Sequence, residues 1–350
     1  MATEQSGAKT PVRGKKRKQT QHEFMKQMTH KEREAYYYGL FEHGPKQWAE
    51  HSDVIQYEKD KEKHVARIII NNPEFKNSIP HGAYPRMTHF IRQAEYDDDV
   101  KTLIFKAVGP DFGTGANVGE LGFMIGFGDG TTPEELKRPT QHRRLWFDRD
   151  MLFGPRGVEG ALQRFSKVSI FAVKGYCYGF HFQLAMAADL VIAAEDTLFS
   201  HPAWRYLGPV FNYYNLLETV GKRATAEMLF TGGPFTAQRA YQLGMVNAVV
   251  PKDKVEQEAE EWAAAVVSRP LDGIVMGKVL MEMIAETRGQ TNGSMCGYLG
   301  HTWMTNQVLR EDEFNFTKQR RDKGVSQTLV DVDMRLPARF RMSRRRRALP

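Results

Sequence analysis

A short apolar strand that runs through a glycine turn into an Ala-rich helix constrains this fold more than any other feature. The strand Val168 to Val173 is followed by a turn that ends at Gly179, and an apolar helix begins at Phe180. Such a turn points backbone N–H groups into a pocket at the start of a helix, where they stabilise a developing negative charge. The segment therefore predicts a strand–turn–helix unit with an anion-stabilising site at the turn.

A second segment of the same kind lies upstream. The apolar strand Thr102 to Phe105 leads into a glycine-containing turn over 110–121. Two such turns can supply two N–H donors to one carbonyl oxygen, which is the arrangement called an oxyanion hole. Both turns together, in this order, indicate acyl-group chemistry more strongly than either turn alone.

The two turns resemble those of the crotonase (enoyl-CoA hydratase/isomerase) superfamily. The resemblance extends to the Asn-Pro and Asn-Ser positions of 67–78, to the strand 188–194 and to the stretch 220–251. It covers residues 54–325 and is most specific over 168–251. It implies that the N–H groups of Ala116 and Phe180 form the oxyanion hole.

The resemblance implies an α/β fold, a crotonase-like stacked ββα spiral with a C-terminal helical region. The expected parts are a basic N-terminal extension (1–50), a crotonase core (54–251), a helical trimerisation region (252–325) and a basic tail (326–350). Periodicity predicts strands at 65–71, 102–107, 168–174, 190–194 and 246–250. It predicts helices at 83–97, 137–166, 180–188, 222–230, 236–243, 252–268, 271–286 and 297–310.

Two positions depart from the hydratase pattern of the family. The resemblance assigns the two catalytic glutamates of hydratases to positions that hold Gln183 and Ala203 here. Glutamine cannot act as an acid or a base, and alanine carries no functional group. We therefore expect cleavage of a C–C or C–X bond by a lyase or hydrolase rather than ordinary enoyl-CoA hydration. The chain also has Phe180-His181 where the family has two glycines.

Other polar residues near the turns are candidates for the chemistry. His181 either assists a water molecule or caps its helix by bonding to the backbone, and His201 precedes the position of the second glutamate. Candidate substrate-binding residues around the cavity are Gln183, Ala203, Arg205, Tyr178 and Tyr206. Asp148 and Asp150 share an expected helix with three arginines, and this pattern favours surface ion pairs.

The resemblance places the CoA-binding residues in two segments. Asn72, Lys76, Asn77 and Ser78 belong to the loop that approaches CoA, and Phe314 and Lys318 match residues near the adenine end. No metal and no prosthetic group are expected, and coenzyme A would enter as part of the substrate. The family's β-diketone hydrolases work without CoA, so a CoA-independent substrate stays open.

The charge of the chain is concentrated at its ends. The net charge is +7; residues 1–35 hold nine Lys/Arg against four Glu, and residues 335–350 hold seven Arg without an acid. Residues 1–22 and the run Arg344 to Arg347 are interpreted as disordered basic tails. Basic tails bind nucleic acid in some proteins, but these lack interleaved aromatic residues and no RNA-binding module is evident. The absence of a signal-peptide pattern and the presence of only two cysteines predict a cytoplasmic protein without a membrane span.

Three functions follow from these features. The first is an enzyme that stabilises the enolate or oxyanion of an acyl-CoA or a related carbonyl compound. The second is a CoA-independent retro-Claisen hydrolase of a cyclic β-diketone. The third is a non-catalytic relative whose basic tails bind nucleic acid. A homo-trimer or hexamer is expected, because the helices of 252–310 present more apolar surface than one domain buries.

Overall fold

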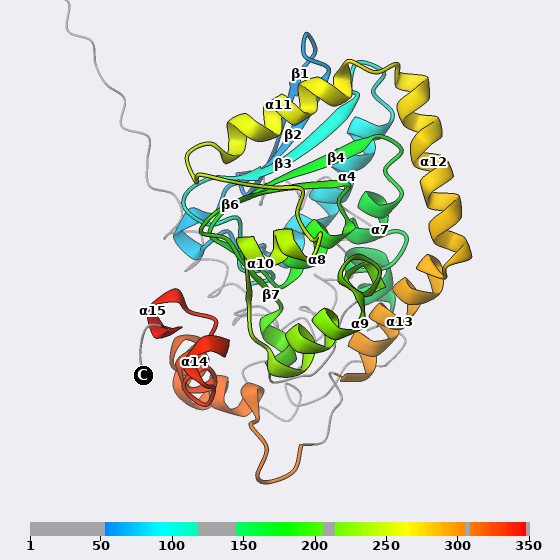
Figure 1. Ribbon diagram of the computed structural model, residues 1–350. Helices are drawn as coiled ribbons and strands as arrows, with labels where there is room; N and C mark the ends of the chain where they lie inside the picture. Colours follow the sequence, from blue (N-terminus) through cyan, green and yellow to red (C-terminus); the bar gives the residue numbers. More distant parts are fainter. Residues whose placement is uncertain (1–52, 118–144, 206–213, 305–308, 348–350) are drawn as a thin grey trace, which may run out of the picture.

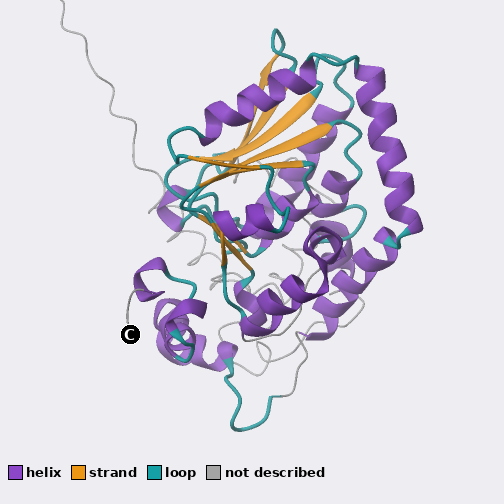
Figure 2. Ribbon diagram, in the orientation of Figure 1, coloured by secondary structure: helices purple, strands orange, loops and turns teal. Residues whose placement is uncertain are grey.

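The computed structural model describes residues 53–117, 145–205, 214–304 and 309–347, which form a mixed α/β fold (Figures 1 and 2). The large sheet has six strands in the order β1-β2-β3-β4-β6-β9, and a smaller sheet has the order β5-β7-β8. The strands are β1 (Ile55–Asp60), β2 (Val65–Ile70), β3 (Thr102–Ala107), β4 (Val168–Val173), β5 (Tyr176–Tyr178), β6 (Leu190–Ala194), β7 (Leu198–Ser200), β8 (Phe235–Thr236) and β9 (Ala248–Val250). All five strands predicted from the sequence are present.

Helices cover both faces of the large sheet, in which only the β1–β2 pair is antiparallel. Strands of such a sheet are buried on both sides, which explains their continuous apolar runs. Helix α11 (Val255–Val267) lies along one face (Figure 1), where Val255, Ala259 and Ala263 form an apolar stripe at four-residue spacing. The other face carries α4 (Tyr84–Glu95), α7 (Val158–Gln163) and α8 (Phe180–Ala187).

The remaining elements lie mostly in the C-terminal half of the chain. They are α9 (Tyr214–Thr231), α10 (Ala237–Gln242), α12 (Leu271–Thr287), α13 (Gln290–Met304), α14 (Phe316–Met334) and α15 (Arg344–Arg347), with short turns η2 (Pro73–Phe75), η3 (His81–Ala83), η4 (Asp148–Leu152), η5 (Pro202–Arg205) and η6 (Ala338–Phe340). No helix among the described residues combines the length and the apolar character that a membrane crossing requires.

The single helix predicted over 137–166 is not formed. Residues 137–144 lie outside the described ranges, and the rest divides into the π-helical turn η4 and the separate helix α7. The interruption contains Gly154, Pro155 and Gly157, which favour a break in a helix. A Cβ on Gly154 would lie 2.2 Å from the Arg149 carbonyl oxygen, so the close return of the chain requires glycine there.

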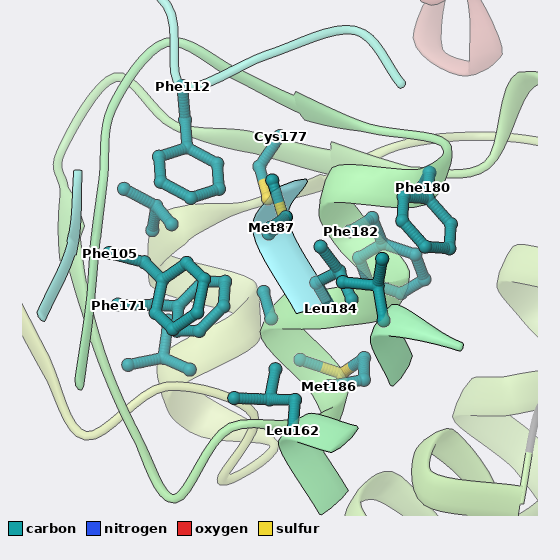
Figure 3. Packing of buried hydrophobic residues seen from close by; sticks show 14 of the residues in the cluster. Met87, Phe105, Phe112, Leu162, Phe171, Cys177, Phe180, Phe182, Leu184 and Met186 are labelled. Atoms are coloured by element: carbon teal, nitrogen blue, oxygen red, sulfur yellow. The ribbon is translucent and has the colours of Figure 1, made fainter. Parts of the chain in front are cut away.

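The core between the sheet and α8 is rich in aromatic rings (Figure 3). Phe105 of β3 and Phe171 of β4 stack with their ring centres 4.4 Å apart. Cys177 is fully buried in this core, and burial raises the pKa of its thiol. Cys177 therefore packs as a small apolar residue of the core.

The C-terminal residues pack on the molecule instead of forming the basic tail expected over 326–350. The expected boundary at 325 falls inside α14, one residue after a kink at Gly324. Beyond α14, Arg341 and Met342 are buried. The Tyr178 hydroxyl donates to the Met342 carbonyl at 2.7 Å. The prediction of a tail rested on charge alone, which does not reveal acceptors elsewhere in the fold.

The arginine cluster begins with a residue that has specific partners. Arg344 donates to the Asp196 carbonyl at 2.7 Å, and its guanidinium lies 4.7 Å from the centre of the Tyr176 ring. The basic N-terminal extension (1–50) lies outside the described residues.

Candidate functional site

The two glycine turns of the sequence meet in the structure. The first turn follows β3 and pairs with the chain around β5, since Gly113 N–H donates to the Tyr176 carbonyl at 2.7 Å and Tyr178 N–H to the Gly113 carbonyl at 2.9 Å. The second turn is tied to the end of β7, because Gly179 N–H donates to the Ser200 carbonyl at 2.9 Å. β3 and β4 are parallel neighbours, so their C-terminal ends lie at the same edge of the sheet. Both turns follow these strand ends and therefore lie at that edge.

Gly115 and Gly179 allow the closest approach between the turns. Gly115 has φ +90° and Gly179 has φ +61°, conformations that side chains with a Cβ rarely adopt. A Cβ on Gly115 would lie 2.9 Å from the Phe180 backbone nitrogen. The residue after Gly115 is Ala116, so both predicted donors belong to adjoining backbone segments.

The N–H groups of Ala116 and Phe180 have no acceptor among the backbone carbonyls of the described residues. Phe180 is the first residue of α8, where helical geometry leaves an N–H without an intrahelical partner. The Ala116 segment is held from its other side, where Ile79 N–H donates to the Gly115 carbonyl and Asn117 N–H to the Ile79 carbonyl, both at 2.9 Å. This arrangement leaves two neighbouring donors for a ligand oxygen.

His181 joins the two turns through its side chain. Its Nδ1 accepts a hydrogen bond from the Gly115 N–H at 2.9 Å. The ring is fully buried and lies edge-to-face against Phe112. Burial lowers the pKa of His181 to about 3. The imidazole is therefore neutral at pH 7, and Nδ1 is the acceptor in this tautomer.

His201 lies just after β7. Its ring stacks on Trp204, with ring centres 5.5 Å apart. Desolvation, followed by the charge of nearby His301, lowers the pKa of His201 to about 3. The imidazole of His201 is therefore uncharged at pH 7 and can act in the site only in its neutral form.

Gln183 follows Phe180 by one helical turn and contacts a buried acid. Its Nε2 donates to Glu159 Oε2 on α7, and both residues are buried. Glu159 has no local signal in the sequence, because no spacing links α7 to α8. Ala203 lies in the turn η5 that follows β7, on the side of the second glycine turn.

Asp148 differs from the expected surface ion pair, whereas Asp150 agrees with it. Asp150 pairs with Arg149 and Arg156 at 2.6 and 3.0 Å. Asp148 is fully buried; its Oδ2 accepts from the Thr302 hydroxyl at 2.8 Å, and its Oδ1 lies 2.9 Å from His301 Nδ1. The aromatic residues before Asp148 are the only local signal of burial, and its partner Thr302 lies 154 residues later.

Tyr178 and Arg205 have partners in the C-terminal segment. The Tyr178 hydroxyl binds the Met342 carbonyl, and the Arg205 guanidinium forms a buried ion pair with Asp333 of α14. These contacts engage the polar ends that substrate binding would need, so packing explains both side chains. Tyr206 lies outside the described residues.

The 72–78 turn is closed by its own asparagines. Asn77 is fully buried, and its Nδ2 donates to the carbonyls of Val108 and Asp111 at 2.8 and 2.7 Å. Asn72 Nδ2 donates to the Ser78 carbonyl at 2.7 Å. Ser78 contributes its backbone carbonyl to this bond and not its side-chain hydroxyl.

Lys76 is an exposed cation of this turn. Its ammonium lies 5.1 Å from the centre of the Tyr176 ring, which Arg344 also contacts. Two positive charges therefore lie near one ring at the edge of the site.

Phe314 and Lys318 lie at the start of the C-terminal helical segment. The Phe314 ring lies 5.2 Å from the Arg335 guanidinium, and Lys318 N–H donates to the Asn315 side chain that caps α14. These contacts are within the C-terminal region and carry no information about adenine binding.

Comparison with known proteins points to one family. The family model described as enoyl-CoA hydratase/isomerase matches residues 155–300. A mitochondrial enoyl-CoA hydratase of Pongo abelii is 26% identical over 218 residues, which are 61% of this chain and 68% of the relative. A mevalonyl-coenzyme A hydratase of Beauveria bassiana is 24% identical and covers 61% of this chain and 73% of its own length.

A solved structure agrees with the sequence matches. The crystal structure of an enoyl-CoA hydratase/isomerase from Xanthobacter autotrophicus Py2 aligns with a TM-score of 0.67 and 25% identity. The alignment covers 81% of this chain and 98% of that chain. The fold predicted from the resemblance is therefore confirmed.

Proposed function

We propose that this chain, which belongs to the crotonase (enoyl-CoA hydratase/isomerase) superfamily, binds an acyl-CoA thioester and stabilises the oxyanion of its enolate. The observation that carries the proposal is the approach of the two glycine turns, with Gly115 packed against the Phe180 nitrogen. A thioester carbonyl oxygen held by the N–H groups of Ala116 and Phe180 would gain charge as the enolate forms. Donors fixed before the reaction stabilise that charge most.

We further propose that the reaction cleaves a C–C or C–X bond and is not ordinary hydration. Gln183 and Ala203 occupy the positions that the family resemblance assigns to the hydratase glutamates. Neither side chain transfers a proton. Coenzyme A enters as part of the substrate, with Lys76 and Arg344 as the cations available near the 72–78 turn for its phosphates.

Removal of one N–H donor tests the oxyanion hole. Ala116→Pro deletes the N–H group, and Ala116→Gly is the matched control that retains it. The loss of one such donor typically costs about 2.7–4 kcal/mol, or roughly 100- to 1,000-fold in rate. The measured step is exchange of the α-protons of butyryl-CoA with D₂O, followed by NMR.

Binding is measured separately through the thermal shift that butyryl-CoA produces in each variant. We expect Ala116→Pro to slow exchange by at least 100-fold while Ala116→Gly stays within about tenfold of the native rate. Equal exchange in a folded Ala116→Pro protein would exclude Ala116 from the site. A native protein that neither binds nor exchanges butyryl-CoA, acetyl-CoA or crotonyl-CoA would contradict the acyl-CoA assignment. Binding of a cyclic β-diketone in the same assay would then favour the CoA-independent hydrolase.

A further inference from the structure

A histidine and a buried aspartate meet beside the second glycine turn. Asp148 lies on the π-helical turn η4, and His301 lies near the end of α13. His301 Nδ1 is 2.9 Å from one carboxylate oxygen of Asp148, and the Thr302 hydroxyl donates to the other oxygen at 2.8 Å. Two consecutive residues of one helix therefore contact both oxygens of one carboxylate. π-Helical turns of this kind occur frequently at functional sites.

One aromatic ring connects this pair to the oxyanion turn. The Phe153 ring packs edge-to-face against His301, with centres 5.0 Å apart, and against Phe180, with centres 5.9 Å apart. His201 directly follows β7. His301 is close enough to His201 for the charge of His301 to lower the pKa of His201. His201 follows Ser200, whose carbonyl accepts from Gly179. His301 therefore lies near the second turn, with the Phe153 ring between its own ring and that of Phe180.

The burial of the two residues is graded. The Asp148 side chain has no exposed surface, whereas 14% of the His301 side chain is exposed. In catalytic pairs of a base and an orienting acid, the acid is buried and the base is accessible to the substrate. Asp148 and His301 follow this order. Because Nδ1 contacts Asp148, exchange of a proton with a ligand has to occur at Nε2.

We infer that His301 is the proton-transfer group of this site and that Asp148 positions its ring. The inference rests on the proposed function, in which Gln183 and Ala203 cannot act as the base and the buried Glu159 carboxylate is bound to the Gln183 amide. The His301 Nε2 lone pair takes a proton from the carbon next to the thioester carbonyl. The C–H electron pair becomes the C=C bond of the enolate, and the carbonyl π pair moves to the oxygen.

The second half of the step returns the proton. Asp148 pairs with the imidazolium that forms, while the N–H groups of Ala116 and Phe180 hold the oxyanion. The imidazolium then gives its proton back to the substrate carbon or to a leaving group. No oxidant, metal or other reactant is needed to balance this step.

The α-proton exchange of butyryl-CoA in D₂O tests the assignment. His301→Asn retains an amide that can donate to Asp148 and removes the titrating ring. His89→Asn is the matched control, because His89 is an exposed histidine of α4. General base catalysis contributes about 100- to 10,000-fold. We expect His301→Asn to slow exchange at least 100-fold with an unchanged butyryl-CoA thermal shift, and His89→Asn to exchange at the native rate.

The outcomes separate this inference from the proposed function. Native exchange that survives within threefold in His301→Asn but is lost in Ala116→Pro would overturn the assignment of His301 and leave the oxyanion hole intact. A native protein without exchange would overturn the proposed function and this inference together.

A second variant covers the case in which His301→Asn does not fold. Asp148→Asn leaves an oxygen near Nδ1 but removes the counter-ion of the imidazolium. We expect slower exchange with an unchanged butyryl-CoA thermal shift, because the imidazolium that forms loses its counter-ion. His201, which precedes η5, and Tyr298, one turn earlier on α13, are titratable residues near His301. Exchange at the native rate in Asp148→Asn would contradict the pairing, and exchange that is lost only in His201→Asn would assign the proton transfer to His201.

Discussion

The Gly115 N–H donates to Nδ1 of His181 across 2.9 Å, so the side chain of one glycine turn holds the backbone of the other. The ring therefore bonds to backbone, but to the first turn and not to its own helix. Its Nε2 has no hydrogen-bond partner among the described residues, and the role of assisting a water molecule stays a prediction. A Cβ on Gly113 would lie 2.1 Å from Nε2, so the ring tip lies directly under the first turn. His181 thus fixes the position of the turn that carries Ala116.

The neutral state of His181 predicts a pH-dependent loss of stability. The unfolded chain binds a proton at this residue below about pH 6.5, whereas the folded protein binds it only near pH 3. Acid therefore favours the unfolded state, and stability falls as the pH falls from 6.5 towards 3. Between pH 7.5 and 5 this one group contributes a loss of about 2 kcal/mol.

His181→Asn isolates that contribution, because asparagine offers an acceptor for Gly115 and does not titrate. We expect the urea unfolding free energy of the native protein to fall by about 2 kcal/mol more than that of His181→Asn over this pH range. Parallel pH profiles for the two proteins would show that His181 is protonated equally in the folded and unfolded states.

Much of the fold is predictable because its signals are local. The five strands of apolar residues and the helices with four-residue apolar spacing were found from periodicity. The strands β1, β5, β7 and β8 were missed. The last three have only two or three residues, which carry no periodic signal, and β1 has a single buried residue, Ile55, at its start. Helix α14 was missed because Gly324 divides its pattern.

The residues of the candidate site also divide into those with a local signal in the sequence and those without one. Gly115, Gly179 and Phe180 were found from the turns themselves. His301 and Glu159 were not found, because each is recognised only by a tertiary contact. The partner of His301 is Asp148, and the partner of Glu159 is Gln183. A buried carboxylate contact across the chain leaves no pattern in a single sequence.

Helix α12 predicts self-association. Its exposed side includes Met276, Leu280 and Met283, each more than half exposed, and no residue of α12 is buried. An apolar stripe of this kind is usually covered by another copy of the chain. We expect the native protein to sediment as a trimer or a hexamer at micromolar concentration, and Leu280→Lys with Met283→Lys to sediment as a monomer.

Tyr96→Lys serves as the control, because Tyr96 is 82% exposed but lies at the end of α4. This variant should keep the native assembly. A native chain that is monomeric at these concentrations would count against the trimer.

The buried ion pair between Arg205 and Asp333 predicts how firmly the C-terminal segment is attached. Asp333 is fully buried and also accepts from the Met342 and Ser343 N–H groups at 2.8 and 3.1 Å. Arg205→Ala leaves that carboxylate without its cation, and breaking a buried pair costs about 3–5 kcal/mol. We expect a lower urea midpoint and faster tryptic cleavage after residues 339–347.

The exposed pair of Arg239 and Glu227 provides the comparison. Arg239→Ala should cost about 0–1 kcal/mol, because solvent screens such pairs. If Arg205→Ala were no more destabilising than Arg239→Ala, the contact with Asp333 would not anchor the segment.

The contact between Gln183 and Glu159 determines how hydratase activity could be restored. The native protein should hydrate crotonyl-CoA poorly, since Gln183 and Ala203 transfer no proton. Gln183→Glu alone places a second carboxylate against the buried Glu159, and two carboxylates at this distance cannot both ionise. We therefore expect Gln183→Glu with Ala203→Glu to be destabilised by about 1–3 kcal/mol and to gain little activity.

Exchange of the two partners removes that conflict. Gln183→Glu with Glu159→Gln keeps one carboxylate and one amide in contact, so its urea midpoint should stay near the native value. Addition of Ala203→Glu to this pair then supplies the second acid, and crotonyl-CoA hydration measured by absorbance should rise at least 100-fold above the native rate. The triple variant should also exceed the Gln183→Glu, Ala203→Glu double variant, because only the former allows the new carboxylate at position 183 to ionise. Robust hydration by the native protein, or equal rates in these two variants, would show that the Gln183–Glu159 contact does not control proton transfer at this site.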